Sequence, residues 1–196
     1  MKLIKFLPLL ILLIILCPAR SFADRPEITA GQSYFDIFKG YYVLKDNVHV
    51  VMNNHGFQAT ISADEAKVNV VTQKCWATGK VKFTHGAETF ACDKAYLQWK
   101  TRTAEVIGGV KFNSPKNLKV SADSAIFNWQ TKIVDFYGRV NVTPFSNLKM
   151  SGGLKLSNRL YSHVRYDVLE NTILQIEENS TTPQIVIPDP DNDSEG

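Results

Sequence analysis

Three aspartates recur at nearly equal spacing and are the first candidates for chemistry in this chain of 196 residues. Asp64, Asp93 and Asp123 lie 29 and 30 residues apart, and carboxylates that come together in pairs can act as general acid and base. Equivalent residues of stacked repeats, however, line up along one ladder. We therefore interpret the three aspartates as turn or bulge residues whose carboxylates accept hydrogen bonds from nearby N–H groups.

The other residues that could carry catalysis or bind a metal form no recognisable arrangement. The four histidines stand in no Ser/His/Asp or Cys/His pattern and at no zinc-finger spacing: His49, His55, His85 and His163. No phosphate-binding loop or GxGxxG motif is present. The acidic run from Asp189 to Asp193 lacks the glycine and the distal glutamate of a calcium loop. The sequence therefore predicts no enzyme, no cofactor and no metal site.

The aspartates belong to an internal repeat of about thirty residues. The hexapeptide Ile-Ser-Ala-Asp-Glu-Ala at 61–66 recurs in related form at 90–95 and at 120–125. A second block, Gly-x-Val-x-apolar, keeps the same rhythm at 79–83, 108–112 and 138–142. Two blocks that share one period indicate stacked structural units.

Within each repeat, apolar residues alternate with polar ones, which predicts strands. Polar clusters such as 72–74 follow as turns, and the glycine before each valine is expected to begin the next strand. No stretch of the body shows a helical period, so the body is predicted to be all-β, with about twelve to sixteen short strands. Such units bury their apolar faces only by stacking. The expected fold is an elongated double-sheet sandwich or jelly roll with open edges at both ends.

The common phase of the alternation predicts which side chains face the interior. Phe83, Phe90, Phe112, Val120 and Phe127 all occupy inward positions. Periodicity does not separate a sealed core from an apolar groove, so the residues alone leave both alternatives open.

The chain divides into three parts of unlike charge. Lys2 and Lys5 precede an apolar run over 6–17, and small residues precede Asp24, which predicts a secretory signal peptide over 1–23. The alternative is retention of this segment as a membrane anchor. Residues 24–176 carry 19 bases and 13 acids and form the predicted β domain. Residues 177–196 carry six acids and no base, and their Ser, Thr, Asp and Pro content predicts a disordered acidic tail.

Export changes how the two remaining cysteines are interpreted. An oxidising compartment permits a disulfide between Cys75 and Cys92. Their alignment with alanines and a valine of the other repeats indicates inward positions, so two buried free thiols are the alternative.

A signal peptide followed by Gly-x-Val-x-apolar blocks that alternate with Ser-Ala-Asp-x-Ala-x-apolar blocks resembles the OstA-like, or LptA, family of periplasmic lipopolysaccharide transport proteins. The resemblance covers roughly residues 40–160. It implies a twisted, open-ended β-jelly roll in the periplasm, without catalysis, that carries lipopolysaccharide between the inner and outer membranes. It also implies docking to like-fold proteins in both membranes. The cysteine pair and the acidic tail depart from the family pattern.

The resemblance favours the groove over the sealed core. The groove residues expected to contact lipid A acyl chains are then Ile61, Val81, Phe83, Phe90, Leu97, Val110, Phe112, Val120, Phe127 and Val140. Open terminal edges predict head-to-tail oligomers. Export and the alternation of lysines with core residues argue against nucleic acid. The alternative functions are a structural or adaptor protein of the cell envelope with a sealed β core, or a membrane-anchored LptC-like component if the N-terminal segment is retained.

Overall fold

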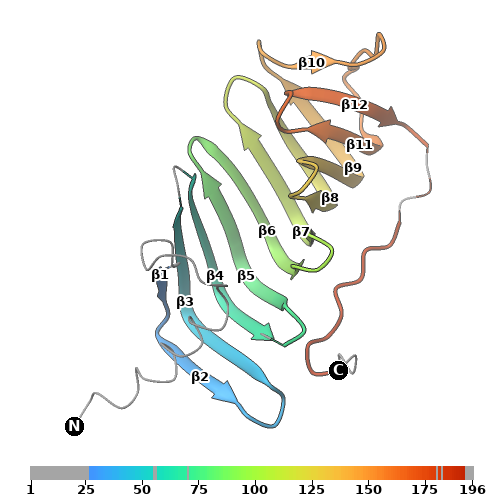
Figure 1. Cartoon of the computed structure of the whole chain (residues 1–196). Helices are drawn as coiled ribbons and strands as arrows, with labels where there is room; N and C mark the ends of the chain where they lie inside the picture. The colour runs from blue at the N-terminus through green and yellow to red at the C-terminus, as the bar shows by residue number, and fades with distance from the viewer. Residues whose placement is uncertain (1–26, 55–56, 70, 180, 182, 193–196) are drawn as a thin grey trace.

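The computed structural model describes residues 27–54, 57–69, 71–179, 181 and 183–192 (Figure 1). The predicted signal peptide over 1–23, the mature N-terminus near Asp24 and His55 lie outside these residues. The described part contains twelve strands and no helix, so none of it is a helix that could cross a bilayer. The strands are β1 (Glu27–Thr29), β2 (Gln32–Asp36), β3 (Tyr41–Asn54), β4 (Phe57–Asn69), β5 (Lys74–His85), β6 (Glu88–Gln98), β7 (Thr103–Ser114), β8 (Leu118–Asn128), β9 (Ile133–Pro144), β10 (Lys149–Met150), β11 (Tyr161–Asp167) and β12 (Thr172–Glu177).

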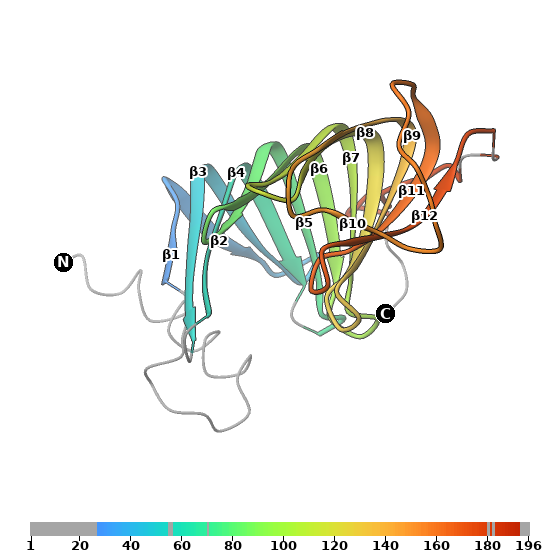
Figure 2. The ribbon, with the colours of Figure 1, turned by 90° about the horizontal axis from the view of Figure 1, so that it is seen from above.

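All strands belong to one open sheet, which confirms the all-β prediction. The order is β1-β3-β4-β5-β6-β7-β8-β9-β11-β12-β10. β1 and β2 pair with different halves of the same edge of β3. Neighbours are antiparallel except for the short β10–β12 pair. The two ends of the sheet do not meet, so β1 and β2 stand at one end and β10 at the other (Figures 1 and 2).

The repeats are hairpins of long strands, and the repeated glycines lie in the middle of strands. β5 and β6 form one unit of 12 and 11 residues, and β7 and β8 form the next. The prediction that a glycine begins each strand, and that the strands are short, is therefore wrong. Gly138 adopts φ +94°, and a Cβ added there would collide with the Asp123 carboxylate on the neighbouring strand. The pairing of β8 with β9 shifts register at this point, which defines a β-bulge.

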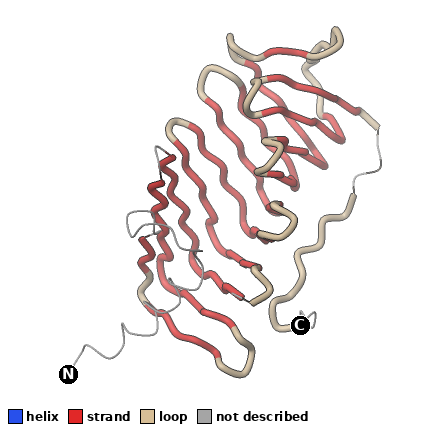
Figure 3. Tube along the Cα trace, in the orientation of Figure 1, coloured by secondary structure: helices blue, strands red, loops and turns tan. Residues whose placement is uncertain are grey.

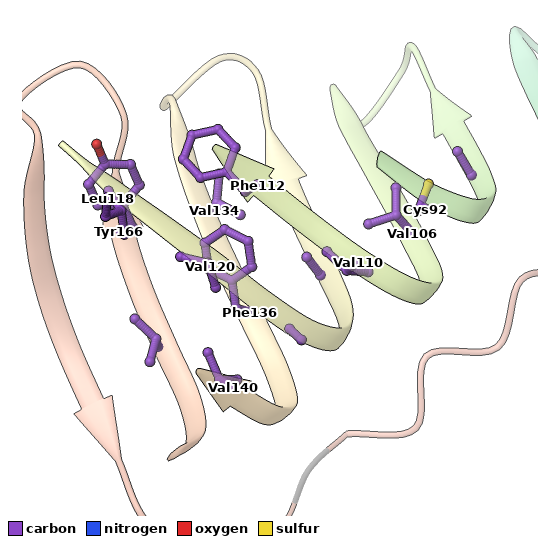
Figure 4. Close-up of a cluster of buried hydrophobic side chains, with 14 of the residues drawn as sticks. Cys92, Val106, Val110, Phe112, Leu118, Val120, Val134, Phe136, Val140 and Tyr166 are labelled. Carbon is purple, nitrogen blue, oxygen red and sulfur yellow. The ribbon is translucent and has the colours of Figure 1, made fainter. Parts of the chain in front are cut away.

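The bulges fold the sheet onto itself. Ala122 and Ala125 are both buried although they are three positions apart, because the strand reverses its inward side at Asp123 and Ser124. The ribbon curls at these points, and side chains from both strand halves fill the space between (Figure 4). The sheet thus has two arms that face each other, which gives the predicted sandwich from a single sheet. The first arm comprises 41–45, 65–69, 74–78, 94–98, 103–107, 124–128 and 133–137, and the second arm comprises 48–54, 57–63, 81–85, 88–92, 110–114, 118–122 and 140–144. Tyr166 of β11 and Ile173 of β12 continue the first arm, and Ile28 of β1 continues the second.

The polar clusters after the strands form turns, as predicted. The Asn69 side-chain oxygen accepts hydrogen bonds from the backbone N–H groups of Val71 and Thr72, at 3.0 Å each. Asn128 does the same for the two residues that follow Trp129, at 2.9 and 3.1 Å. These side-chain caps fix the turn between β4 and β5 and the turn between β8 and β9.

Part of the segment predicted as a disordered acidic tail lies against the sheet. Residues 183–192, the strap, run back from the β12 end toward β3 as the long loop in Figure 3. Ile187 packs against a buried cluster that includes Tyr41 and Trp76. Composition alone could not predict this, because the strap is held by aromatic residues far away in sequence.

Candidate functional site between the two arms

The second arm presents a continuous apolar row to the interior. Cross-strand pairing places one residue from each of eight strands side by side. The row is Ile28, Val50, Ile61, Phe83, Phe90, Phe112, Val120 and Val142. Five of the predicted groove residues therefore lie in this row.

A second row follows the bend between the arms. Val81 pairs with Cys92, Val110 pairs with Ala122, and the side chains are buried. Val140, which pairs with Tyr161, completes it at the β9–β11 end. The predicted residues Val81, Val110 and Val140 thus line the floor of the interior.

The first arm supplies the facing wall. Leu97 and Phe127, the two remaining predicted residues, belong to its inward row. The row is Val68, Cys75, Leu97, Ala104, Phe127, Val134, Tyr166 and Ile173. Nearer the bend the same arm carries Ala66, Ala77 and Ala95, which leave more room between the arms than larger side chains would. All ten predicted residues therefore face one interior.

The interior side chains are fully buried toward the β12 end of the sheet, the closed end, and only half-buried near β4 to β6. Val110, Phe136, Val140 and Ile173 have no exposed surface. Ile61, Phe83, Phe90 and Leu97, from β4 to β6, are only half-buried. The segment after β9 contributes to the closed end, since it packs four apolar side chains against the core: Leu148, Met150, Leu154 and Leu156.

Polar groups in and beside strands β6, β7 and β11 hold the closed end together, and the repeat pattern did not single them out. Ser114 donates a hydrogen bond to Glu88 Oε1 at 2.8 Å, and Asn117 donates to Ser114 Oγ at 2.7 Å. The Tyr166 hydroxyl donates to Asn171 Oδ1 at 3.1 Å. Burial, together with the nearby Glu88 carboxylate, raises the pKa of Tyr166 to about 12, so this hydroxyl stays protonated at neutral pH.

Both cysteines face the interior as free thiols. Cys75 pairs with Leu97 and Cys92 pairs with Val81, so the two lie on adjacent strands, five residues out of register. No strand intervenes between them, because Val81 follows Cys75 on the same strand. Burial raises the pKa of each thiol to about 12, which keeps both unreactive at neutral pH.

The repeated aspartates lie at the β-bulges, and the carboxylate of Asp123 accepts hydrogen bonds there. The Arg139 backbone N–H donates to Asp123 Oδ2 at 3.0 Å, and the Arg139 guanidinium donates to Oδ1 at 3.0 Å. Hydrogen bonds from Arg139 lower the pKa of Asp123. A Cβ on Gly79 or Gly108 would likewise collide with Asp64 or Asp93, so the three repeats share one construction.

A polar network that sequence reasoning missed lies on the outer face of β9 and β11. His163 Nε2 lies 2.7 Å from Asp135 Oδ1, and Arg165 donates to both oxygens of that carboxylate at 2.8 and 3.0 Å. The Tyr137 ring stacks on His163 with centroids 4.8 Å apart. Glu177 Oε2 lies 3.7 Å from His163 Nδ1. The described residues contain no group of three side chains placed to hold a metal ion.

The comparisons with known proteins bear on the fold. No family model and no curated protein matches the chain. Among solved structures it is similar to that of LptH from Pseudomonas aeruginosa, the LptA-homologous periplasmic component of the conserved lipopolysaccharide transport device. The TM-score is 0.53 at 10% sequence identity, over 63% of this chain and 97% of that chain. At this identity the likeness is one of fold, and it confirms the LptA-type open jelly roll.

Proposed function

We propose that this protein is a periplasmic carrier that shelters the acyl chains of lipopolysaccharide between its two arms. The observation that carries the proposal is the pair of facing apolar rows, which cross the whole sheet and are only half-buried from β4 to β6. The likeness to LptH, a periplasmic component of the lipopolysaccharide transport device, supports the same function.

The physical need for such a shelter is large. Burial of each CH₂ group is worth about 0.8 kcal/mol, so an acyl chain of about fourteen carbons costs roughly 10 kcal/mol to hold in water. Phe83, Phe90 and Leu97 offer apolar surface that the protein itself leaves half-covered. Acyl chains laid against these side chains would remove both surfaces from water.

The open ends of the sheet suit docking to like-fold partners in both membranes. At one end β3 is covered only by the short strands β1 and β2. At the other end β10 covers β12 only at Thr172 and Ile173. Unpaired strand edges accept a further strand by main-chain hydrogen bonding, and this would extend the apolar rows into a partner.

A photoreactive side chain tests the proposal in the exported, full-length protein. Phe83 faces the interior, while its neighbour Lys82 is exposed on the opposite side of the same strand. A photoreactive residue at Phe83 should capture lipopolysaccharide in cells, and the matched control at Lys82 should not. Equal capture at both positions would contradict an interior site.

The closed end favours the second candidate function. Val110, Phe136 and Val140 are completely buried, as in a sealed core. A structural or adaptor protein of the envelope would show no capture at Phe83 or Lys82 and would contain no lipid by mass spectrometry after purification. If the N-terminal segment is retained, the carrier becomes a membrane-anchored component, and N-terminal sequencing of the exported protein distinguishes these cases.

A further inference from the structure

The outer face of the first arm carries an aromatic cluster, where solvent-exposed polar side chains are expected. Trp76 and Tyr96 alternate with inward residues on β5 and β6, so their rings point away from the interior. Trp76 contacts Tyr41 edge-on at 5.5 Å between centroids and Tyr96 at 5.2 Å. These rings are buried together with Val43, and the residue that packs onto them from outside the sheet is Ile187 of the strap.

The same rings donate hydrogen bonds to the backbone of the strap. Trp76 Nε1 donates to the Pro188 carbonyl at 2.9 Å, and the Tyr41 hydroxyl donates to the Pro190 carbonyl at 2.5 Å. Proline has a fixed φ and no N–H, so alternate prolines keep a segment extended with its carbonyls free to accept. No strand pairing holds residues 183–192. Aromatic rings that donate to proline carbonyls are the chemistry of grooves that bind proline-rich peptides.

Charge fixes one end of the strap. Asp191 Oδ1 lies 2.9 Å from Lys39 Nζ and 3.4 Å from Lys67 Nζ. Lys39 stands in the turn between β2 and β3, at the edge of the sheet. A pocket of about 410 Å³ remains between the prolines and the sheet, and Lys94 and Ile107 contribute to its lining. On the sheet side, Lys39, Lys67 and Lys94 thus lie around the strap together with one acid, Glu65, and the space beneath the strap is incompletely filled.

We propose that Tyr41, Trp76 and Tyr96 form a binding site for an acidic, proline-containing extended peptide, and that the chain's own Ile187-Pro188-Asp189-Pro190-Asp191 occupies this site in cis as a detachable ligand. The site lies on the opposite face of the arm from the lipid-facing rows, so it is independent of the lipid proposal. Its recognition elements are one apolar side chain, two proline carbonyls and one carboxylate. Exposed ion pairs and two hydrogen bonds hold the strap weakly enough to exchange.

The test uses the full-length chain with and without a docked strap. The double variant Ile187→Asp, Asp191→Lys removes the apolar anchor and reverses the charge that faces Lys39. A fluorescent synthetic peptide of residues 184–192 is titrated into wild type and variant, and polarisation is recorded. The variant should bind the peptide one to one, and wild type should bind it at least about tenfold more weakly, because the strap competes in cis.

Matched substitutions assign the binding to the site. In the strap variant, Tyr41→Phe keeps the ring and removes its donor, and Trp76→Phe replaces the indole with a smaller ring that has no donor. Each should weaken binding several-fold while circular dichroism stays unchanged. A peptide with alanine in place of both prolines should bind more weakly. Equal binding to wild type and strap variant, or binding to neither, would overturn the proposal. A wild-type dimer that the strap variant abolishes would place the strap between copies and overturn the cis assignment.

Discussion

The ring of Phe112 lies 5.9 Å from the ring of Phe136, although β8 separates the strands that carry them. Strands two positions apart in a flat sheet are about 9.5 Å apart. The contact therefore forms across the interior, from the second arm to the first. Phe112 also meets Tyr166 of β11, with centroids 6.0 Å apart. One aromatic side chain thus joins the two arms at the closed end.

Truncation of an interior ring should lower the free energy of unfolding more at the closed end than at the half-buried end. Phe136 is completely buried, so Phe136→Ala should lower the free energy of unfolding by about 3–5 kcal/mol. Phe83 is half-buried, so Phe83→Ala should cost only about 1–2 kcal/mol while it reduces lipid capture by a probe at Phe90. Urea unfolding followed by circular dichroism measures both. Equal losses of stability would contradict the difference in closure.

The glycine bulges should tolerate no side chain. In Gly138→Ala the new Cβ meets the Asp123 carboxylate and the backbone keeps a positive φ, so the free energy of unfolding should fall by about 2–4 kcal/mol. Gly86→Ala is the matched control, because Gly86 also has positive φ but no atom within 4 Å. It should cost only about 1–2 kcal/mol. Urea midpoints that fall equally would show that the carboxylate plays no part.

Acid should weaken the outer network at Asp135. Burial alone would raise the pKa of this carboxyl, but hydrogen bonds from His163 and Arg165 outweigh it and lower the pKa. A carboxyl whose folded pKa is below its unfolded pKa stabilises the fold above the unfolded value, near pH 4, and this contribution is lost as pH falls through the folded pKa. Unfolding free energies measured from pH 7 to pH 3 should therefore fall less steeply in Asp135→Asn than in wild type. Identical pH profiles would contradict this role.

The two thiols should be free and shielded. At pH 8 a thiol of pKa about 12 is almost wholly protonated, so Cys75 and Cys92 should resist alkylation in the folded protein. Both should react once the protein is denatured without reductant. Mass spectrometry of exported protein counts the added groups, and a mass that shows none after denaturation would reveal a disulfide.

The open edge of β12 should support head-to-tail assembly. Leu174 is exposed and has no partner in the register with β11, and β10 ends its pairing at Ile173. Leu174→Pro should distort β12 beside this open edge and so block growth of the assembly with concentration, while Leu174→Ala should not. Multi-angle light scattering distinguishes the two. A wild-type protein that is monomeric at every concentration, or that stops at a closed two-fold dimer, would contradict assembly through this edge.

The residues that face the interior could be predicted from the sequence, because apolar and polar side chains alternate along each strand. Phe83, Phe90 and Phe112 share one phase in three repeats, and the structure places them in one row. The predicted strand boundaries were wrong. The pattern predicts that the glycine of each Gly-x-Val block begins a strand, whereas Gly79 lies within β5. A bulge depends on the facing Asp64, which lies 15 residues earlier on another strand.

The features that escaped prediction depend on long-range contacts. Trp76 and Tyr96 occupy positions of the outer face, and only the strap, about a hundred residues away, explains why they are aromatic. Asp135 and His163 are 28 residues apart and meet because β9 pairs with β11. Composition predicted disorder for the strap, since its two prolines and its acids are typical of unfolded segments.

The bulged hairpin is a unit of fixed size, so the number of units sets the length of the sheet. Each unit of 29 or 30 residues closes its own turns and carries its own bend, and its strands pair with those of the units on either side. Insertion of one unit would therefore lengthen the space between the arms by two strand spacings, about 9.5 Å, and would leave both terminal edges unchanged. Evolution can adjust the span of such a molecule in fixed steps, by duplication or loss of whole units, without redesign of its ends.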